Sequence, residues 1–445
     1  MVYGLLFVIY GFFAYFQPKY ALGLMLFLLP TYQIKFQIFK IPFTFLEIMI
    51  LILFAVWLAK NTKNKELKIK NEIRRLKNSS WFWLICVWLA IATVSMFVAP
   101  DLRAAAGVWK AYFIEPILFL LVLLDLAKNN PNAANKENVI KVVFFSLSAS
   151  VFGCSVWAIL QKWLGGGVWS AEVWGQPLVW RAAGPFPHPN FLGLYLAPLI
   201  VLGVGYLIIN FRKKCWVVIC HLLFIILAFW ALVLSRSEGA IFGVLAGFLL
   251  LGLVLKKSRK YVLIGLMIFV ILAAVYPVSR HYLLEKALLR DLSGQFRLNI
   301  WSGAVSLLKN SPILGVGLDG YERLVAAYQA NNFVAVGGEK FFAPTQPYPH
   351  NLFLAIWLEL GLVGLIIFIW ILFKFFKQGV GTIKNQDVYS LQFAVYSVMD
   401  SMVAVIVHGL VDTPYFKNDL AIVFWLIIGL GIILKDDYEN QISDN

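Results

Sequence analysis

Apolar residues recur in long runs along almost the whole chain, and short polar stretches separate them. About twenty apolar residues folded as a helix match the thickness of a bilayer core. The pattern predicts 12 or 13 membrane-spanning helices, because the first two runs can be two helices or one broken element. The runs are residues 2–16, 20–34, 42–60, 81–99, 111–128, 139–160, 191–210, 215–234, 239–255, 261–277, 350–374, 390–409 and 419–435.

The composition supports a membrane protein. Hydrophobic residues make up 61% of the chain and charged residues 14%, whereas a soluble domain is about half apolar and a quarter charged. A soluble core cannot bury so many apolar helices. We therefore expect an all-α, polytopic transmembrane helical bundle that forms a single integral membrane domain over residues 1–445. The first run lacks a basic start and a small-residue cleavage site, so it is predicted to be a membrane helix rather than a signal peptide.

The net charge of +15 follows the expected topology. Lys and Arg concentrate in the cytoplasmic loops of membrane proteins. The basic stretches 60–78, 211–215, 256–260 and 374–386 fall on one side if the helices alternate. Topology explains this charge without a nucleic-acid partner. The four cysteines lie in or beside apolar runs without metal-like spacing, and we expect no disulfide.

Residues 278–349 are predicted to be a long extracytoplasmic loop before the third-last helix. A connection of about seventy residues is far longer than usual. The stretch 293–312 has an amphipathic helical pattern and can lie on the membrane surface. Its apolar face consists of Phe296, Ile300, Trp301, Ala304, Leu307 and Leu308.

Three arginines, Arg181, Arg236 and Arg297, fall on the outer side in this topology. Arginine at membrane depth is costly unless it is paired. Its planar fork matches phosphate oxygens bidentately, so convergence of the three predicts an anion site. The alternative is that they form ion pairs with the nearby acids Glu238 and Asp291.

A histidine, His350, begins the apolar run 350–374. Pro349 and Asn351 suit a helix start. The positive end of the helix dipole disfavours imidazolium, and a neutral imidazole can accept a proton as a general base. The alternative is an interfacial histidine bonded to backbone or lipid. In another external turn, His408 and Asp412 have i, i+4 spacing and can pair.

Two further groups are candidates for substrate binding. His188 and Asn190 lie in the proline-rich stretch 184–190, where His188 can contact substrate and Asn190 can cap the following helix. Arg103 and Lys110 flank the helix that begins at 111, where they attract anionic lipid or simply extend to the interface. The chain shows no metal motif and no phosphate-loop motif, so we predict neither a metal nor a cofactor.

Four motifs in order resemble the O-antigen ligase family, whose relatives include the O-antigen polymerases and the bacterial O-linked oligosaccharyltransferases. The similarity covers about residues 181–364. The motifs are "RAAGPFPHPNFLGLYLAP", "LSRSEGAIFG", "FRLNIWSGAVSLLKNSPILGVGLDGY" and "PHNLFLAIWLELGLVGL".

The resemblance implies a metal-independent glycosyltransferase in the bacterial cytoplasmic (inner) membrane. It would move a glycan from an undecaprenyl-diphosphate carrier to a hydroxyl of a glycolipid, glycan or protein on the extracytoplasmic face. By position, Arg236 and Arg297 look like the family's diphosphate-binding arginines, and His350 looks like its essential histidine. Arg181 is similar to an arginine of some relatives. Two alternatives stay open: a polymerase that joins lipid-linked repeats, and a transporter or flippase of lipid-linked glycan.

The predicted topology can be tested by labelling. Single cysteines placed in 278–349 of a cysteine-free variant should react with an impermeant thiol reagent in intact cells. Cysteines in 60–80 or 256–260 should react only after permeabilisation, because these basic stretches are expected inside. Labelling of 278–349 only after permeabilisation would contradict the predicted orientation.

Overall fold

A computed structural model describes most of the chain. The described residues are 2–38, 41–63, 80–128, 133–170, 179–210, 215–254, 256–275, 277–329, 333–336, 338–384 and 389–443. Their secondary structure is mainly helical, which confirms the predicted all-α class. The basic stretches 60–78 and 211–215 lie mostly outside the described residues.

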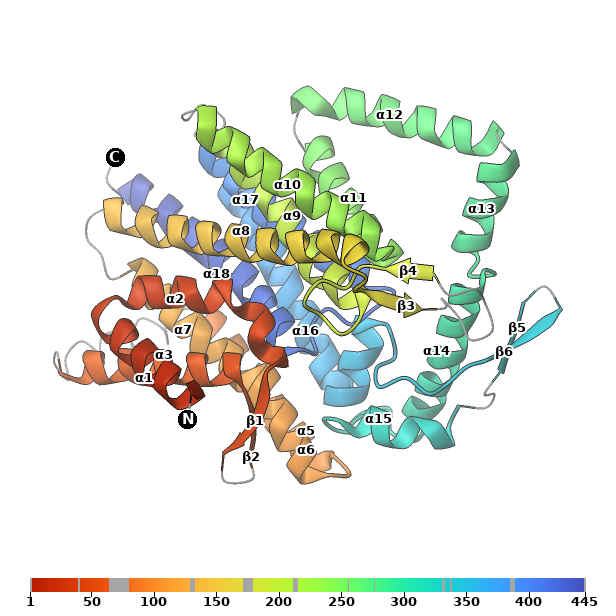
Figure 1. Cartoon of the computed structure of the whole chain (residues 1–445), viewed down its shortest axis with the longest axis horizontal. Helices are drawn as coiled ribbons and strands as arrows, with labels where there is room; N and C mark the ends of the chain where they lie inside the picture. Colours follow the sequence, from red (N-terminus) through yellow and green to blue (C-terminus); the bar gives the residue numbers. More distant parts are fainter. Residues whose placement is uncertain are drawn as a thin grey trace.

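Long apolar helices pack side by side and form the body of the molecule (Figure 1). Two short helical segments, the 3-10 turn η1 (Leu29–Gln33) and the π-helical turn η2 (Lys110–Ile114), join some of them. The longer helices are α1 (Val2–Phe16), α2 (Pro18–Phe27), α3 (Phe45–Lys63), α5 (Ser80–Val98), α6 (Leu102–Trp109), α7 (Glu115–Lys128), α8 (Ala133–Trp163), α9 (Pro189–Asn210), α10 (Cys215–Ser235), α11 (Glu238–Val254), α12 (Lys256–Val275), α16 (Leu352–Lys384), α17 (Tyr389–Gly409) and α18 (Asn418–Ser443).

Within the described residues, eight helices are long and apolar enough to cross a membrane. This confirms a polytopic helical protein, although the number is below the 12 or 13 expected from the apolar runs. One reason is that α1, α2 and α11 contain 15, 10 and 17 residues, so each is shorter than a typical span. The predicted runs 2–16 and 20–34 form two helices, not one broken element.

The segment after α12 turns away from the bundle and forms α13 (Pro277–Ala287), α14 (Leu292–Asn310), α15 (Gly320–Leu324) and the 3-10 turn η3 (Val325–Ala327). Figure 1 shows α13 and α14 at the right, on the side opposite the C-terminus. The predicted amphipathic helix is present as α14. Its buried residues pack against protein, because Ala304, Leu307 and Leu308 contact Tyr321 and Leu358 in one apolar cluster.

Three antiparallel hairpins interrupt the helical pattern, and the sequence pattern did not predict them. They are β1 (Lys35–Ile38) with β2 (Ile41–Thr44), β3 (Val168–Ser170) with β4 (Val179–Arg181), and β5 (Phe333–Val336) with β6 (Glu339–Phe342). Each strand has three or four residues, too few for a clear alternating pattern. The second hairpin matters for the site, because it ends at Arg181, paired in register with Val168.

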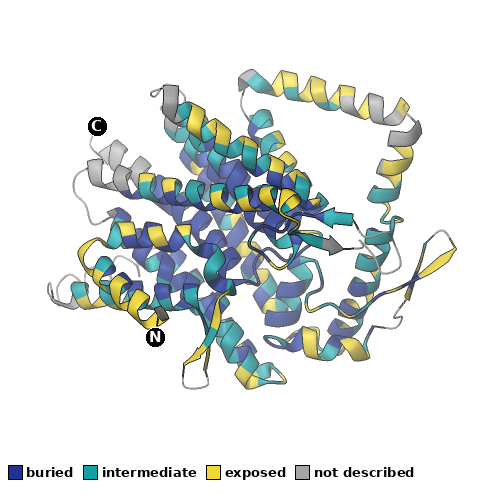
Figure 2. Ribbon diagram, viewed as in Figure 1, coloured by how far each residue is buried: buried dark blue, intermediate teal, exposed yellow. Residues whose placement is uncertain are grey.

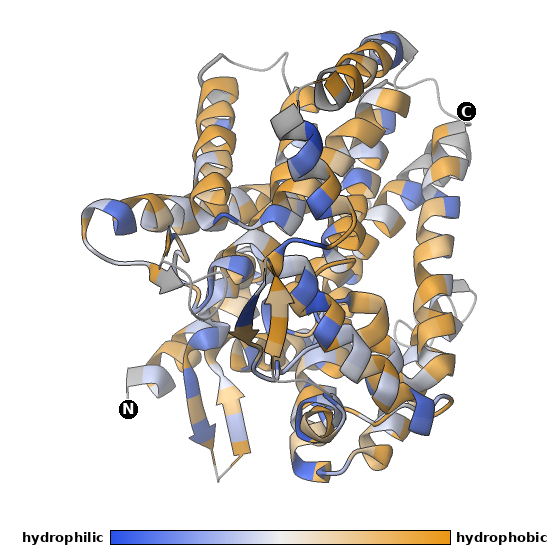
Figure 3. Ribbon diagram, turned by 90° about the vertical axis from the view of Figure 1, so that its right-hand side faces the viewer, coloured by the Kyte–Doolittle hydropathy of each residue, from blue (hydrophilic) through white to orange (hydrophobic). Residues whose placement is uncertain are grey.

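The core lies at the centre of the bundle, where α9, α17 and α18 are buried (Figure 2). Trp88, Tyr415 and Trp425 are fully buried there. Exposed apolar side chains occur on the outer faces of α10 and α12, as expected for surfaces that contact lipid. Figure 3 views the molecule onto the side that carries α13 and α14, and most of its helical ribbon is hydrophobic.

A sharp break divides α16 at Gly361, whose φ is 72°. The loop before α15 inserts at this break. The Leu362 amide donates to the Ile313 carbonyl at 2.9 Å, and the Val316 amide donates to the Leu358 carbonyl at 2.7 Å. The Asp319 amide also donates to the Glu359 carboxylate. These bonds fix the short first part of α16, which begins two residues after His350.

Replacing Gly361 should destabilise this junction. A Cβ at Gly361 meets the Ile313 carbonyl oxygen, and its positive φ suits glycine. Gly361→Ala should lower the free energy of unfolding by about 1–3 kcal/mol and lower the Tm in detergent. Gly107→Ala is the control, since that helical glycine has open space around it. An unchanged Tm for Gly361→Ala would contradict the role of the break.

Candidate functional site

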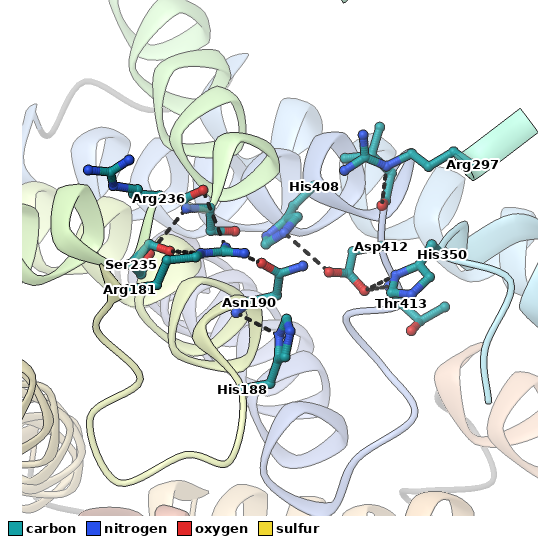
Figure 4. A network of polar contacts seen from close by, with 12 residues as sticks. Arg181, His188, Asn190, Ser235, Arg236, Arg297, His350, His408, Asp412 and Thr413 are labelled. Carbon is teal, nitrogen blue, oxygen red and sulfur yellow. Dashed lines mark hydrogen bonds and ion pairs between the residues drawn. The ribbon is translucent and has the colours of Figure 1, made fainter. Parts of the chain in front are cut away.

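One cavity of about 220 Å³ lies between the loop before α9, the α10–α11 turn, α14, the start of α16 and the end of α17. Most of the predicted site residues line it, although they come from segments far apart in the sequence. These residues are Arg181, His188, Asn190, Arg236, Arg297 and His350. His408 and Asp412 also line the cavity. In Figure 4, Arg236 lies at one end of this group, and His350 and Arg297 lie at the other.

Arg181 holds the cavity wall together. Its side chain is buried, and its Nε donates to the Ser235 carbonyl at 2.8 Å. The terminal Nη2 donates to Asn190 Oδ1 at 2.7 Å and to the Arg236 carbonyl at 3.3 Å. A buried guanidinium needs such partners. The arginine predicted to bind substrate therefore joins the end of α10 to the start of α9.

Arg236 occupies the two-residue turn between α10 and α11, and its side chain is exposed. Its φ of 50° is in the left-handed region, which costs a residue with a Cβ about 1–2 kcal/mol. Within the described residues, its guanidinium has no hydrogen bond or ion pair. Figure 4 shows this side chain directed away from His350. Among the described residues, the turn thus presents an exposed cation without a partner.

Arg297 lies on α14 and reaches the cavity from the opposite side. Its Nε donates to the Val411 carbonyl at 3.3 Å. Ser293, Phe296 and Ile300 line the cavity from the same helix, at the spacing of one helical face. The apolar face predicted for this segment therefore borders the site at Phe296 and Ile300.

The acids that the sequence offered as partners for the arginines bind elsewhere. Glu238 Oε2 lies 2.7 Å from Lys286 Nζ, and Asp291 Oδ2 lies 2.9 Å from the same nitrogen. Among the described residues, neither acid forms an ion pair with Arg236 or Arg297. Within the described residues, the alternative in which these acids pair with Arg236 or Arg297 is therefore not observed.

His350 is held by a buried carboxylate. Its Nδ1 lies 3.2 Å from Asp412 Oδ1, and the ring is 29% exposed. Its φ is 46°, another left-handed conformation. Asn351 caps α16 as predicted, because its Oδ1 accepts from the Leu354 amide at 3.0 Å. The Asn351 Nδ2 also donates to the Leu410 carbonyl, which ties the histidine to the end of α17.

Asp412 contacts two histidines. Its Oδ2 lies 4.0 Å from His408 Nε2, the pair expected from the i, i+4 spacing, but His350 lies closer. Burial alone raises the pKa of Asp412, but His350, His408 and the Thr413 amide together hold that pKa well below its usual range. An ionised carboxylate only accepts hydrogen bonds, so Nδ1 of His350 carries the hydrogen in this pair.

His188 and Asn190 lie on the wall beside Arg181. The Asn190 amide donates to His188 Nδ1 at 3.2 Å. The helix α9 begins at Pro189, and the Asn190 side chain binds Arg181 instead of capping the helix as expected. Burial lowers the pKa of His188 to about 4, with a further contribution from Arg181. His188 is therefore neutral at physiological pH.

Arg103 and Lys110, also expected to bind substrate, are not among the residues that line this cavity. Arg103 is exposed on α6. The Lys110 ammonium pairs with the buried Glu47 at 3.0 Å, donates to the Pro42 carbonyl and lies over the Phe43 ring. Lys110 therefore connects the α6–α7 region to the first hairpin.

The sequence is similar to one protein family and to several known proteins. The sequence model of the family described as O-antigen ligase matches residues 222–369. A protein of Rickettsia conorii named "Putative polysaccharide ligase" is 26% identical over 173 residues, 39% of this chain and 39% of the relative. A protein of the same name from Rickettsia typhi is 27% identical over 221 residues, 48% of this chain and 51% of the relative.

A third such protein, from Rickettsia prowazekii, is 27% identical over 206 residues, 46% of this chain and 47% of the relative. The resemblance to the O-antigen ligase family is confirmed. The chain spans about half the length, or less, of these curated relatives. The O-antigen ligase match contains Arg236, Arg297 and His350, whereas Arg181 and Asp412 lie outside it and reach the cavity through the fold.

Arg181 and Arg236 should respond differently to the same substitution. Arg181→Lys cannot keep the forked contacts to Asn190 and the turn, so the free energy of unfolding should fall by about 1.5–3 kcal/mol. Arg236→Lys should change it by less than about 0.5 kcal/mol, as for other exposed positions. Thermal unfolding of the purified protein in detergent measures both. Equal changes in the free energy of unfolding would contradict the assignment of a structural role to Arg181 and an exposed position to Arg236.

Proposed function

We propose that the protein transfers a glycan from an undecaprenyl-diphosphate carrier to an acceptor hydroxyl at the extracytoplasmic face of the bacterial inner membrane. The family match and the names of the relatives support a polysaccharide ligase. One observation carries the proposal. Arg236, Arg297 and the His350–Asp412 pair all line one cavity, with Arg236 at one end and Arg297 and His350 at the other.

The arginines suit the donor. Breaking the bond between a sugar and a diphosphate leaves negative charge on the phosphate oxygens. Fixed guanidinium groups stabilise such charge most where water is excluded, and a planar fork binds two oxygens at once. Among the described residues, no three His, Cys, Asp or Glu side chains are grouped as a metal site would require. The proposal therefore assigns charge stabilisation to Arg236 and Arg297.

The histidine suits the acceptor. Because Asp412 accepts from Nδ1, the Nε2 atom of His350 can take the proton of the acceptor hydroxyl. The acceptor oxygen then bonds to the anomeric carbon, and the bond from that carbon to the phosphate oxygen breaks. The electron pair leaves with the diphosphate. A single direct displacement of this kind inverts the anomeric centre.

The arrangement of α12 supports the outer face as the place of reaction. This helix begins with the basic stretch 256–260 and leads to α13, and α14 with Arg297 follows. Basic connections favour the cytoplasmic side. The proposal takes the apolar remainder of α12 to bring the chain from there to the opposite side.

The proposal can be tested with purified protein in liposomes, a synthetic polyprenyl-diphosphate glycan and candidate acceptors. Wild type should release the carrier only when an acceptor is present, and a chelator of divalent metals should have no effect. Chains of repeated units made from the donor alone would identify a polymerase instead. Absence of release with every acceptor would contradict glycan transfer.

Substitutions in the cavity should separate the two roles. His350→Gln keeps hydrogen bonding but loses basicity, and should lower the rate about a hundredfold or more. Arg236→Lys or Arg297→Lys should lower transfer roughly ten- to two-hundred-fold, because a point charge lacks the planar fork. Arg103→Lys is the control outside the cavity. Near-normal transfer by His350→Gln would exclude this histidine as the base.

A further inference from the structure

Lys286 on α13 connects two other parts of the structure. Its ammonium lies 2.7 Å from Glu238 Oε2 at the start of α11 and 2.9 Å from Asp291 Oδ2 just before α14. The lysine side chain is 20% exposed and that of Asp291 is 19% exposed. The Tyr282 hydroxyl donates to the other Glu238 oxygen at 3.3 Å. These partly buried contacts form a small network rather than one isolated surface pair.

Both acids stand close in sequence to the arginines assigned to the diphosphate. Glu238 lines the cavity and follows Arg236 by two residues, while Asp291 precedes the helix that carries Arg297. A free carboxylate at either place would attract a guanidinium and repel a phosphate. Charges only a few ångströms apart interact strongly near a protein surface. The ammonium of Lys286 offsets both negative charges.

We propose that Lys286 is a positioning residue that keeps Glu238 and Asp291 away from the diphosphate-binding arginines and holds α14 against the start of α11. This inference rests on the proposed function, since it assumes an anionic donor at Arg236 and Arg297. Lys286 acts through the two acids. It is not among the residues that line the cavity.

The charge state of Lys286 agrees with this role. Partial burial alone lowers the pKa of Lys286, but hydrogen bonds to Glu238 and Asp291 raise it above its ordinary value. The lysine therefore stays charged throughout the physiological range. The same network fixes a helix of the long segment after α12 to the bundle, so the position of Arg297 relative to Arg236 depends on it.

The test uses the full-length protein in liposomes at low ionic strength. Lys286→Ala should raise the KM for the polyprenyl-diphosphate donor about three- to tenfold and change kcat little, because a partly exposed charge network contributes modestly and affects donor binding. Added salt should reduce the difference. Lys286→Arg should keep most donor affinity. Lys309→Ala, which removes an exposed lysine from the end of α14, is the matched control.

Removal of the acids distinguishes positioning from direct binding. The triple variant Lys286→Ala, Glu238→Gln, Asp291→Asn should recover most of the donor affinity, because no free carboxylate remains. A KM for the donor as high in the triple variant as in Lys286→Ala would overturn the proposal, since Lys286 would then bind the donor itself or only stabilise the fold. A wild-type KM in Lys286→Ala would also overturn it.

Binding of inorganic pyrophosphate, measured calorimetrically, separates this inference from the proposed function. Wild type should bind pyrophosphate, Lys286→Ala should bind it more weakly, and the triple variant should recover. This pattern without glycan transfer would refute the transferase function and support the role of Lys286. Transfer by wild type with equal pyrophosphate affinity in all three proteins would refute the role of Lys286 alone. A wild type that neither binds pyrophosphate nor transfers glycan would refute both.

Discussion

The buried guanidinium of Arg181 joins the parts of the protein that form the cavity. A charge without water must be met by polar groups. Here those groups are Asn190 and the backbone carbonyls of Ser235 and Arg236. The short α10–α11 turn is thus fixed against the start of α9. Asp412 has a similar role at the His350 end of the cavity. Its buried carboxylate contacts His350 and accepts from the Thr413 amide.

Two of the proposed reactive side chains, those of Arg236 and His350, lie at ends of helices. Arg236 lies between two helices, and His350 lies just before one, both with left-handed backbones. Such conformations are costly and persist where the surroundings enforce them. At these places the chain leaves the apolar bundle, so a polar side chain can meet both water and the lipid-linked substrate of the proposed function. The Gly361 break fixes the short helix behind His350.

The cavity draws on more of the chain than the family match covers. Residues 222–369 supply Arg236, Arg297 and His350. Arg181, which contacts the Arg236 carbonyl, lies before this region, and Asp412, which contacts His350, lies after it. Lys286 lies inside the matched region but acts on the two acids beside the arginines. The contacts that position the cavity residues therefore come from segments that are distant in the sequence.

The sequence by itself determined the membrane-helical class, the cap at Asn351 before α16 and the amphipathic α14, because apolar periodicity and capping are local properties. It also pointed to the three arginines and His350 as one site. Only the tertiary structure decided which arginine is buried and which is available. It also brought Asp412 into contact with His350, 62 residues away in the sequence, and placed Glu238 and Asp291 in ion pairs with Lys286. Spacing along one helix predicts an i, i+4 pair such as His408 and Asp412, but contacts between distant segments depend on packing, which no local pattern encodes.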